Sequence, residues 1–485
     1  MLRTGALVLT TLLLGVSSQG TNALELEECR ISAGPAFPGI KARCGTLERH
    51  ENPDDPESPM LEIRVVVVPA LNLQPEPDPI VPLAGGPGQG AVQFYAAYAA
   101  AFEQVRSDRD ILLVDQRGTG ESARLDCPVD EDLIEGQYSI EETVEYMKAC
   151  LEQLPHDPRY FTTSIAVQDL DAVREALSYP RLNLYGVSYG SRVAQHYARR
   201  YPEATRTIVL DGVVPPQLAL GPDIAIEAQK AIDSIFARCA SDAACNERYP
   251  DIAGSFVSLK NKLDKNPATV SVPHPVTGRT ESLKFGRNEL AASVRLLAYS
   301  PRSIAMLPLL VSEAANGNYQ PLAAQYMMTL LSLADALALG MHNAIMCTED
   351  VPFYSAALID KAALDASFMG PMQLEALEAI CSVWPAGPID DDFKQALSTA
   401  IPTLLLSGSA DPITPPHFAD MAARNLKKAW LLTGMHQGHG QVAVGCMPRI
   451  IDRFIDTETL ADGDADCFQS SFVMPFFLDF SGPLP

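Results

Sequence analysis

Short, nearly continuous apolar runs recur along this chain and alternate with segments of helical periodicity. Runs without polar alternation are typical of strands that are buried on both faces of a sheet. The predicted strands are residues 61–69, 79–84, 110–114, 182–186, 207–210, 403–406 and 429–432. Residues 163–178 and 191–200 carry helical patterns, and the second follows a predicted strand directly. This alternation predicts an α/β fold with a mainly parallel sheet.

The middle of the chain differs, because residues 215–401 show few strand signals. Helical patterns rich in Ala, Leu and Met dominate there. They span residues 224–240, 287–297, 321–339 and 374–380, and a hairpin or short extended piece is expected at 268–283. Strand patterning resumes at Pro402. The pattern predicts one α/β core in two parts, residues 24–215 and 401–485, interrupted by a mainly helical cap insertion at 216–400.

The N-terminus has the pattern of a secretory signal peptide. Arg3 precedes an apolar stretch at residues 5–16, which is too short to cross a bilayer. Thr21-Asn22-Ala23 fits a small-x-small cleavage site, so we expect residues 1–23 to be removed; an uncleaved anchor is the alternative. No later stretch has 18 unbroken apolar residues. We therefore expect no integral membrane segment after cleavage and a secreted or periplasmic protein.

The ten cysteines support export, because an even number of cysteines behind a signal peptide indicates disulfides. Their spacing suggests five pairs between sequence neighbours. The candidate pairs are Cys29 with Cys44, Cys127 with Cys150, Cys239 with Cys245, Cys347 with Cys381, and Cys446 with Cys467. No C-x-x-C pair occurs and no cysteine lies near a histidine cluster. We therefore expect no metal, and nothing in the sequence implies another cofactor.

Composition narrows the possible partners. With 60 acidic and 36 basic residues the formal net charge is −24, whereas nucleic acids and anionic membranes both require a basic face. We therefore expect no nucleic-acid partner. Apolar residues make up 47% of the chain, which suffices for a sizeable core and excludes a disordered chain. The oligomeric state stays open.

Gly186-Val187-Ser188-Tyr189-Gly190 matches the pattern G-x-S-x-G of a nucleophile elbow. The motif follows a predicted strand and opens a predicted helix, which is the context that such an elbow requires. Small flanking glycines permit a sharp turn that lifts the Ser188 hydroxyl out of the sheet, and the helix N-terminus favours developing negative charge. An ordinary strand-to-helix turn with a serine cap is the alternative.

A serine nucleophile needs a base, and the base needs an orienting acid. In sites with this elbow the three follow in the chain order Ser, Asp or Glu, His. Asp411 follows a predicted strand through a short turn, and His439 lies in a loop after the last predicted strand. Both are therefore expected at the same sheet edge as Ser188. One alternative is that Asp411 only forms a turn, and another is that the nearby His436 is the base. The glycines beside His439 favour His439, because they allow it to lie at the tip of a loop.

Backbone N–H groups that hold an oxyanion are expected next to the nucleophile. Gly85-Gly86-Pro87-Gly88 follows the predicted strand at residues 79–84, and glycines let backbone amides approach a substrate carbonyl closely. The N–H of Tyr189, directly after the nucleophile, would be the second donor. A plain tight turn is the alternative for the glycine-rich loop.

Further motifs accompany these. They are Asp115-Gln116-Arg117-Gly118-Thr119-Gly120, Tyr160-Phe161-Thr162-Thr163, Asp211-Gly212-Val213 and Asp411-Pro412-Ile413-Thr414-Pro415. With the G-G-P-G and G-x-S-x-G motifs they make the chain resemble the proline iminopeptidase/tripeptidyl aminopeptidase family of α/β-hydrolases, over almost all of the mature chain. It looks closest to the secreted, tripeptidyl-aminopeptidase-like members. Ala84 departs from the small proline iminopeptidases, which carry His before G-G-P-G, and this weakens a strict proline-iminopeptidase assignment.

The resemblance implies an α/β-hydrolase core with a helical cap over the active site, and a tripeptidyl-aminopeptidase-like C-terminal region. It implies Ser188 as the nucleophile, His439 as the general base and then acid, and Asp411 as the residue that orients His439. It also implies Gly86 and Tyr189 as the oxyanion donors.

Aminopeptidases of this family hold the α-ammonium of the substrate with carboxylates of the cap. Glu349 and Asp350 are the candidates here, because paired carboxylates beside a cysteine that forms a disulfide are held in place and complement a cation. A solvated acidic turn is the alternative. Asp115 and Arg117 are interpreted as structural, as a charged pair that braces the loop under the site.

The sequence thus predicts a serine hydrolase that removes one to three residues from the N-termini of small peptides through an acyl-enzyme on Ser188. A cap that narrows access favours exopeptidase over endopeptidase action. A carboxylesterase that acts on small acyl esters with the same triad is the first alternative. A catalytically inactive binding protein on the same fold is the second.

Overall fold

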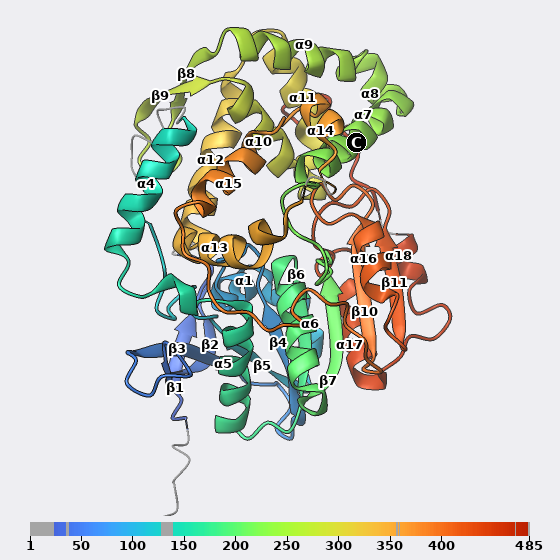
Figure 1. The fold of residues 1–485 in the computed structure, drawn as a ribbon. Coiled ribbons are helices and arrows are strands. Elements are labelled where there is room, and N and C mark those ends of the chain that lie inside the picture. Colours follow the sequence, from blue (N-terminus) through green and yellow to red (C-terminus); the bar gives the residue numbers. More distant parts are fainter. Residues whose placement is uncertain are drawn as a thin grey trace, which may run out of the picture.

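The structure is a computed structural model that describes residues 24–34, 38–127, 139–355, 357, 359–470 and 472–483. The predicted signal peptide, residues 1–23, lies outside the described residues. A nine-stranded sheet forms the centre of the molecule, and a layer of helices lies above one edge of the sheet (Figure 1).

The sheet confirms the α/β-hydrolase fold that the sequence predicts. Its strands are β1 (Glu27–Ile31), β2 (Ile40–His50), β3 (Met60–Val68), β4 (Glu76–Leu83), β5 (Arg109–Val114), β6 (Leu182–Val187), β7 (Thr205–Asp211), β10 (Thr403–Gly408) and β11 (Ala429–Gly434). They follow the order β1-β2-β3-β5-β4-β6-β7-β10-β11. Neighbours from β5 to β11 are parallel, and β1, β2, β3 and β5 pair antiparallel. All the predicted strands are present in this sheet.

The apolar runs do not predict β1 and β2, which form one end of the sheet. In β2 the buried residues Ala42 and Cys44 alternate with the exposed residues Lys41 and Arg43. This alternation arises because one face of an antiparallel ribbon meets solvent. A search for continuous apolar runs therefore misses it.

Helices cover both faces of the sheet. One face carries α5 (Thr163–Ala176), α6 (Tyr189–Arg200) and α16 (Pro416–Ala423), and the other carries α1 (Ala91–Tyr98), α2 (Glu103–Arg106) and α17 (Met447–Thr457). In β6, Leu184 packs with Val193 of α6, whereas its neighbour Tyr185 packs with Phe94 of α1 on the other face. Successive side chains of a strand point to opposite faces of the sheet, so these two neighbours contribute to two separate cores.

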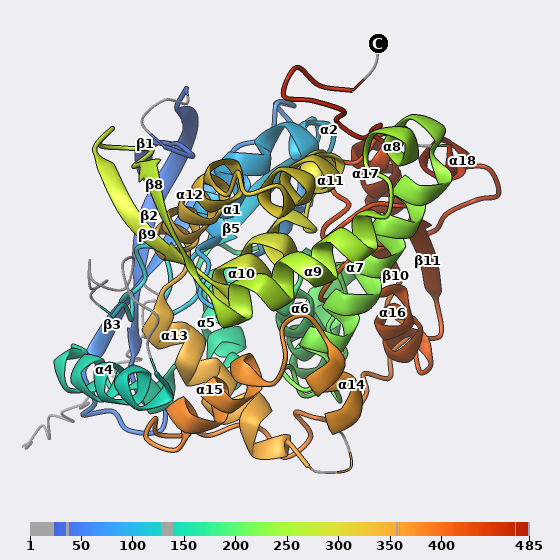
Figure 2. The same cartoon turned by 90° about the horizontal axis from the view of Figure 1, so that it is seen from above.

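Between β7 and β10 the chain leaves the sheet and forms the helical layer, which we call the cap (Figure 1). The cap comprises α7 (Ile224–Ser241), α8 (Ala243–Arg248), α9 (Ile252–Lys265), α10 (Arg287–Leu297), α11 (Pro301–Ala315), α12 (Gln320–Ala336), α13 (Leu339–Ile345), α14 (Lys361–Ala366), α15 (Met372–Cys381) and a hairpin of β8 (Ala268–Pro273) and β9 (Thr280–Phe285). Its apolar core includes Phe236, Phe256 and Leu307. Seen from above, α7, α9 and α10 extend across the molecule (Figure 2). The predicted helices and hairpin all occur here, and the boundaries at 216 and 400 stay a prediction.

The five disulfides join the sequence neighbours that their spacing suggests. The bonds are Cys29–Cys44, Cys127–Cys150, Cys239–Cys245, Cys347–Cys381 and Cys446–Cys467. Two of them lie in one buried cluster with Trp384, where α4 (Ile140–Gln153) packs beside α15. α4, which precedes the cap in the sequence, therefore packs against the cap.

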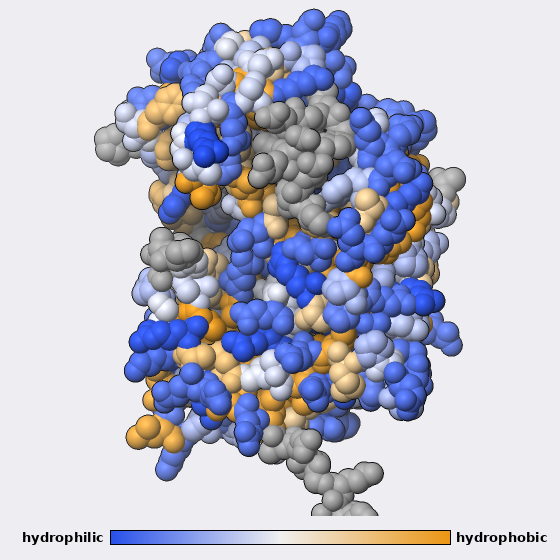
Figure 3. Space-filling view, turned by 90° about the vertical axis from the view of Figure 1, so that its left-hand side faces the viewer, coloured by the Kyte–Doolittle hydropathy of each residue, from blue (hydrophilic) through white to orange (hydrophobic). Residues whose placement is uncertain are grey.

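The side of the molecule at the left of Figure 1, where α4 lies, is mostly hydrophilic, with hydrophobic residues scattered between the polar ones (Figure 3). Polar and charged residues are mostly exposed in folded proteins, so a surface of this kind is expected. In the parts of the chain that the structure describes, no helix combines the length and the apolar character that a membrane span requires.

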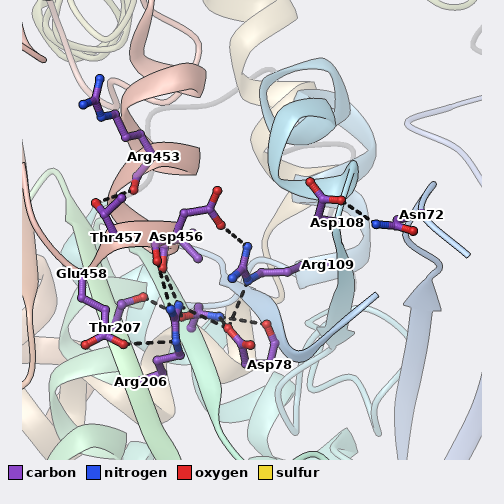
Figure 4. A network of polar contacts seen from close by, with 12 residues as sticks. Asn72, Asp78, Asp108, Arg109, Arg206, Thr207, Arg453, Asp456, Thr457 and Glu458 are labelled. Atoms are coloured by element: carbon purple, nitrogen blue, oxygen red, sulfur yellow. Dashed lines mark hydrogen bonds and ion pairs between the residues drawn. The ribbon is translucent and has the colours of Figure 1, made fainter. Parts of the chain in front are cut away.

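Ion pairs join the strands at the edge of the sheet that lies away from the cap in Figure 1, and Figure 4 shows these pairs from close by. We call this the N-terminal edge, because the parallel strands begin there. Asp78 of β4 pairs with Arg109 of β5 (Nε–Oδ2 3.0 Å) and with Arg206 of β7 (Nη1–Oδ2 3.3 Å). Arg109 also pairs with Asp456 of α17, and Arg206 pairs with Glu458 (Nε–Oε1 3.3 Å). The network joins three strands to the end of α17.

Candidate active site

Ser188 lies in a sharp turn between β6 and α6. Its backbone has φ 56° and ψ −126°, a strained conformation for a residue with a side chain, as in a nucleophile elbow. A Cβ on Gly186 would lie 2.3 Å from Gly190 O, and a Cβ on Gly190 would lie 2.1 Å from Leu83 O, so both positions require glycine. The Ser188 N–H donates to Asp211 O at the end of β7 (2.9 Å). The turn thus presents Ser188 at the edge where the parallel strands end, which we call the C-terminal edge.

Asp411 and His439 form a hydrogen-bonded pair at the same edge. Asp411 follows β10, and its Oδ2 lies 2.8 Å from His439 Nδ1. Its Oδ1 accepts the N–H groups of Ile413 (2.9 Å) and Thr414 (3.0 Å). Burial raises the pKa of Asp411, but the charge of His439 and these hydrogen bonds hold it below its usual value. Burial lowers the pKa of His439, but Asp411 raises it more, so the pair is arranged to stabilise an imidazolium.

The loop after β11 brings the imidazole of His439 next to the elbow. A Cβ on Gly212 would lie 2.9 Å from His439 Cε1. Gly212 directly follows Asp211, whose carbonyl holds the Ser188 N–H. In the described part of this loop, the Asp411 carboxylate binds His439 and does not bind His436, the alternative base. The structure therefore pairs the predicted base with the predicted acid and places this pair next to the turn that carries the predicted nucleophile.

The glycine-rich loop after β4 lies against the elbow. A Cβ on Gly85 would lie 3.0 Å from Ser188 Cβ, so a side chain there would crowd the nucleophile. Gly86 has φ 109°, a conformation that favours glycine. Tyr189 is the first residue of α6, and its N–H is one of the amides that a helix leaves unpaired at its start. The two predicted oxyanion donors thus lie on segments that meet at Ser188.

Two cap segments contact these loops. The His439 N–H donates to Tyr299 O (2.8 Å), just after α10, and the two rings meet edge to face with centroids 5.0 Å apart. At the other loop, the Ala338 N–H donates to Gly88 O (3.0 Å). The end of α10 therefore packs on the base and the start of α13 packs on the glycine-rich loop, so the cap encloses the site from two sides.

Asp211 is a buried carboxylate beside the base that the sequence analysis did not assign to the site. It accepts the N–H of Gln441 (2.8 Å and 2.7 Å), the N–H of Val442 (2.9 Å) and the hydroxyl of Tyr185 (2.7 Å). Burial raises its pKa. These bonds hold the residues that follow His439, so Asp211 positions the loop that carries the base. The Asp-Gly-Val motif at the end of a strand was the available signal.

Thr414 is a second residue that the sequence analysis did not assign. Its hydroxyl donates to Asp411 Oδ2 (2.7 Å) and lies 3.0 Å from His439 Nδ1. The side chain therefore fixes the carboxylate oxygen that faces the imidazole. Its place in the Asp-Pro-Ile-Thr-Pro motif was the available signal in the sequence.

Asp350 does not have the environment that its predicted role requires. It lies in a π-helical turn, Met346–Asp350, and is 0% exposed. It accepts from both terminal nitrogens of Arg192 (2.9 Å and 2.8 Å) and from Lys394 Nζ (3.2 Å). Burial raises the pKa of Asp350, but these cations hold it below its usual value. The protein's own cations neutralise this carboxylate, so it is neither free for a substrate ammonium nor part of a solvated turn.

Glu349 is also fully enclosed, and its carboxylate is bound by a residue of the core. It accepts the backbone N–H (2.7 Å) and the hydroxyl (2.9 Å) of Thr163. The Thr163 hydroxyl lies 2.6 Å from Tyr189 Oη, which also accepts from Gln116 Nε2 (3.0 Å). Burial raises the pKa of Glu349 to about 7. The residue thus links the cap to the side chain that follows the nucleophile.

Asp115 and Arg117 brace the loop under the site, but the prediction that they pair with each other is wrong. Asp115 accepts the N–H groups of Val92 (3.0 Å) and Glu121 (3.1 Å). Arg117 forms a two-bond ion pair with Asp169 of α5 (2.6 Å and 2.9 Å). Asp115 thus binds backbone N–H groups, whereas Arg117 binds a carboxylate of α5. The two residues therefore connect the loop to different parts of the core.

Comparisons with known proteins find relatives among serine hydrolases and peptidases. Residues 366–467 match the family described as TAP-like protein. Serine protease Hip1 of Mycobacterium tuberculosis is 25% identical over 92% of this chain and 91% of its own length. Tripeptidyl aminopeptidase of Streptomyces coelicolor is 30% identical over 30% of this chain and 31% of its own length.

Among solved structures, a serine hydrolase from Cycloclasticus zankles is 14% identical and covers 86% of this chain and 99% of its own, with a TM-score of 0.38. A similarity at this level carries no weight, and the assignment rests on the sheet, the elbow and the relatives by sequence. The chain therefore belongs to the α/β-hydrolase superfamily, as a serine hydrolase with a TAP-like domain.

Proposed function

We propose that this chain is a serine exopeptidase that releases one to three residues from the N-termini of small peptides. The observation that carries the proposal is the hydrogen-bonded pair of Asp411 and His439 beside the Ser188 elbow, beneath a cap. The names of its relatives, a serine protease and a tripeptidyl aminopeptidase, support the choice of a peptide substrate.

In the proposed mechanism the Ser188 hydroxyl attacks the scissile carbonyl while His439 Nε2 takes its proton. Asp411 holds the Nδ1–H of His439 and stabilises the imidazolium. The N–H groups of Gly86 and Tyr189 receive the oxyanion. His439 then gives its proton to the leaving amine, and the acyl-enzyme is hydrolysed by a water molecule that His439 activates.

The position of the cap supports exopeptidase action. Tyr299 lies on the imidazole of His439, and Ala338 binds the glycine-rich loop at Gly88. A long chain that passes through the site in both directions would have to displace one of these contacts. A short N-terminal segment needs only one open side.

Export to an oxidising compartment is part of the proposal. The five disulfides support it, because structural disulfides form and persist outside the cytosol. The signal peptide proposed for residues 1–23 has a direct test. N-terminal sequencing of the exported protein should begin at Leu24, and a protein that starts at Met1 would contradict cleavage.

The activity is tested with a panel of aminoacyl, dipeptidyl and tripeptidyl amides, each with a free and with a blocked N-terminus. We expect cleavage of the free-amine substrates only, and loss of turnover in Ser188→Ala. A fluorophosphonate probe should label Ser188 in the folded protein and fail to label the variant.

Two outcomes would overturn the proposal in different ways. Indifference to the N-terminal block, with activity on p-nitrophenyl esters, would assign a carboxylesterase that uses the same triad. Failure of the probe to label a folded protein would assign an inactive binding protein.

A further inference from the structure

Arg295 lies on the last turn of α10, the part of the cap that packs on the catalytic base. Its Nη2 donates to Tyr299 Oη (3.3 Å). The ring of Tyr299 in turn lies edge to face on the imidazole of His439, with centroids 5.0 Å apart. A single aromatic side chain therefore separates this guanidinium from the base.

The guanidinium of Arg295 has no acidic partner in the described parts of the chain, and its buried Nε has no hydrogen-bond partner there. The buried residues Arg117 and Arg192 are different, since each forms a two-bond pair with a carboxylate. Leaving a charge partly buried and unpaired costs free energy unless another group meets it. In a chain with 60 acidic residues, an arginine without an acid at the catalytic site indicates an anion from outside.

The charge of Arg295 acts on the histidines at both sides of the site. Burial lowers the pKa of His342, whose Nδ1 lies 3.3 Å from Pro87 O, and Arg295 lowers it further. Burial and Arg295 also lower the pKa of His439, against the larger effect of Asp411. An anion bound to Arg295 would offset this charge and favour the imidazolium that forms during catalysis.

We propose that Arg295 and Tyr299 form a carboxylate-binding subsite beside His439, and that preferred substrates carry a carboxylate within reach of the scissile bond. A guanidinium presents parallel N–H donors that match a carboxylate. The Tyr299 hydroxyl accepts from Arg295 and retains its own hydrogen to donate to the same anion. The carboxylate comes from the C-terminus of a short peptide or from an acidic side chain next to the scissile bond. This inference deepens the proposed function and rests on it.

The test compares matched substrates that differ only in one charge. One arm uses the same short peptide with a free or an amidated C-terminus, and the other places Glu or Gln beside the scissile bond. We expect the wild-type protein to prefer the charged member of one arm in kcat/KM by about 10- to 100-fold, as for a charge-assisted hydrogen bond. In Arg295→Gln this ratio should fall to about 1. The arm that shows the preference identifies the source of the carboxylate.

Arg287→Gln is the matched control, because Arg287 begins the same helix and pairs with Asp264 (3.7 Å). This variant should keep the wild-type ratio. No preference in either arm, or a preference that survives in Arg295→Gln, would overturn the subsite.

A second readout does not depend on peptide cleavage. The same ligands should slow fluorophosphonate labelling of Ser188 more when they carry the carboxylate, and Arg295→Gln should remove the difference. Protection without cleavage would overturn the peptidase proposal and support the subsite. Equal protection by charged and neutral ligands would overturn the subsite alone, and absence of labelling in the folded protein would overturn both.

Discussion

The two edges of the sheet both hold buried charges, but the surroundings of these charges differ. At the N-terminal edge Asp78 and Arg109 are almost buried, while their partner Asp456 is half exposed (Figure 4). At the C-terminal edge the cap covers the charges, and Arg192 and Asp350 have side-chain exposures of 1% and 0%. One network reaches the solvent and the other is sealed between core and cap.

Burial under the cap shifts the pKa values of charged groups at the C-terminal edge. Burial raises the pKa of Glu349 to about 7 and lowers the pKa of Lys394 to about 8, so both groups titrate near neutral pH. The candidate base His439 and its partner Asp411 belong to the same enclosed edge. Loops at the carboxyl ends of parallel strands are where α/β proteins place their sites. The comparison indicates that buried charges support the fold at both edges, and that the C-terminal edge also carries the candidate catalytic pair.

The largest effect is expected for Asp411→Asn at the C-terminal edge. The amide no longer holds the Nδ1–H tautomer of His439 or stabilises its imidazolium, so kcat should fall by about 10⁴-fold. The measurement is kcat on the best free-amine substrate, with circular dichroism to show that the variant is folded. Retention of a tenth of the wild-type rate would show that Asp411 does not orient the base.

Asp350→Asn should give the largest loss of stability. It leaves Arg192 and Lys394 buried without their anion, so the free energy of unfolding should fall by about 3–5 kcal/mol. Urea unfolding measures the change. Asp456→Asn is the control at the other edge, where half-exposure limits the loss to about 1 kcal/mol. Equal losses at the two edges would remove the distinction between the sealed and the open network.

Arg109→Met tests whether the N-terminal edge affects only stability. Asp78 loses one partner but keeps Arg206 and the side-chain amide of Asn183 (2.7 Å). The free energy of unfolding should therefore fall by a smaller amount, about 2–3 kcal/mol. The kcat of the folded protein should stay at the wild-type value. A tenfold fall in kcat would mean that this edge is coupled to the site.

A further expected effect concerns the pH dependence of stability. The pKa of Glu349 is raised from 4.5 to about 7 in the folded protein, so the folded state keeps a proton that the unfolded state releases. The stability from Glu349 is then fully present below pH 4.5 and is lost as the pH rises to about 7, by at most about 1.4 kcal/mol per pH unit. Urea unfolding at pH 5, 6 and 7 should show a smaller decline in Glu349→Gln than in the wild type. Equal slopes would contradict the raised pKa.

The fold was largely predictable because its strongest signals are local. Continuous apolar runs identified the strands buried on both faces, and helical periodicity identified the cap helices from 224 to 240 and from 287 to 297. The runs missed β1 and β2, whose exposed face carries charges. The helical patterns did not identify α9 or α11, and Pro308 lies inside α11, where proline is unfavourable.

The sequence by itself determined the elbow and suggested the pairing of the cysteines. Gly186 and Gly190 impose the turn at Ser188 by short-range sterics, and neighbouring cysteines close short loops. Chain order and loop glycines were enough to choose Asp411 and His439, because the parallel strands deliver both to one edge.

Only the tertiary structure decided the partners of the charged residues. Asp350 pairs with Arg192, 158 residues away in sequence, and Arg117 pairs with Asp169 instead of Asp115. Arg295 lies beside the base because α10 packs on the loop that carries His439. The physical reason is that a carboxylate or a guanidinium carries no local signal for its partner. Its partner and its charge state depend on which distant elements packing brings within a few ångströms, and on how far they exclude water.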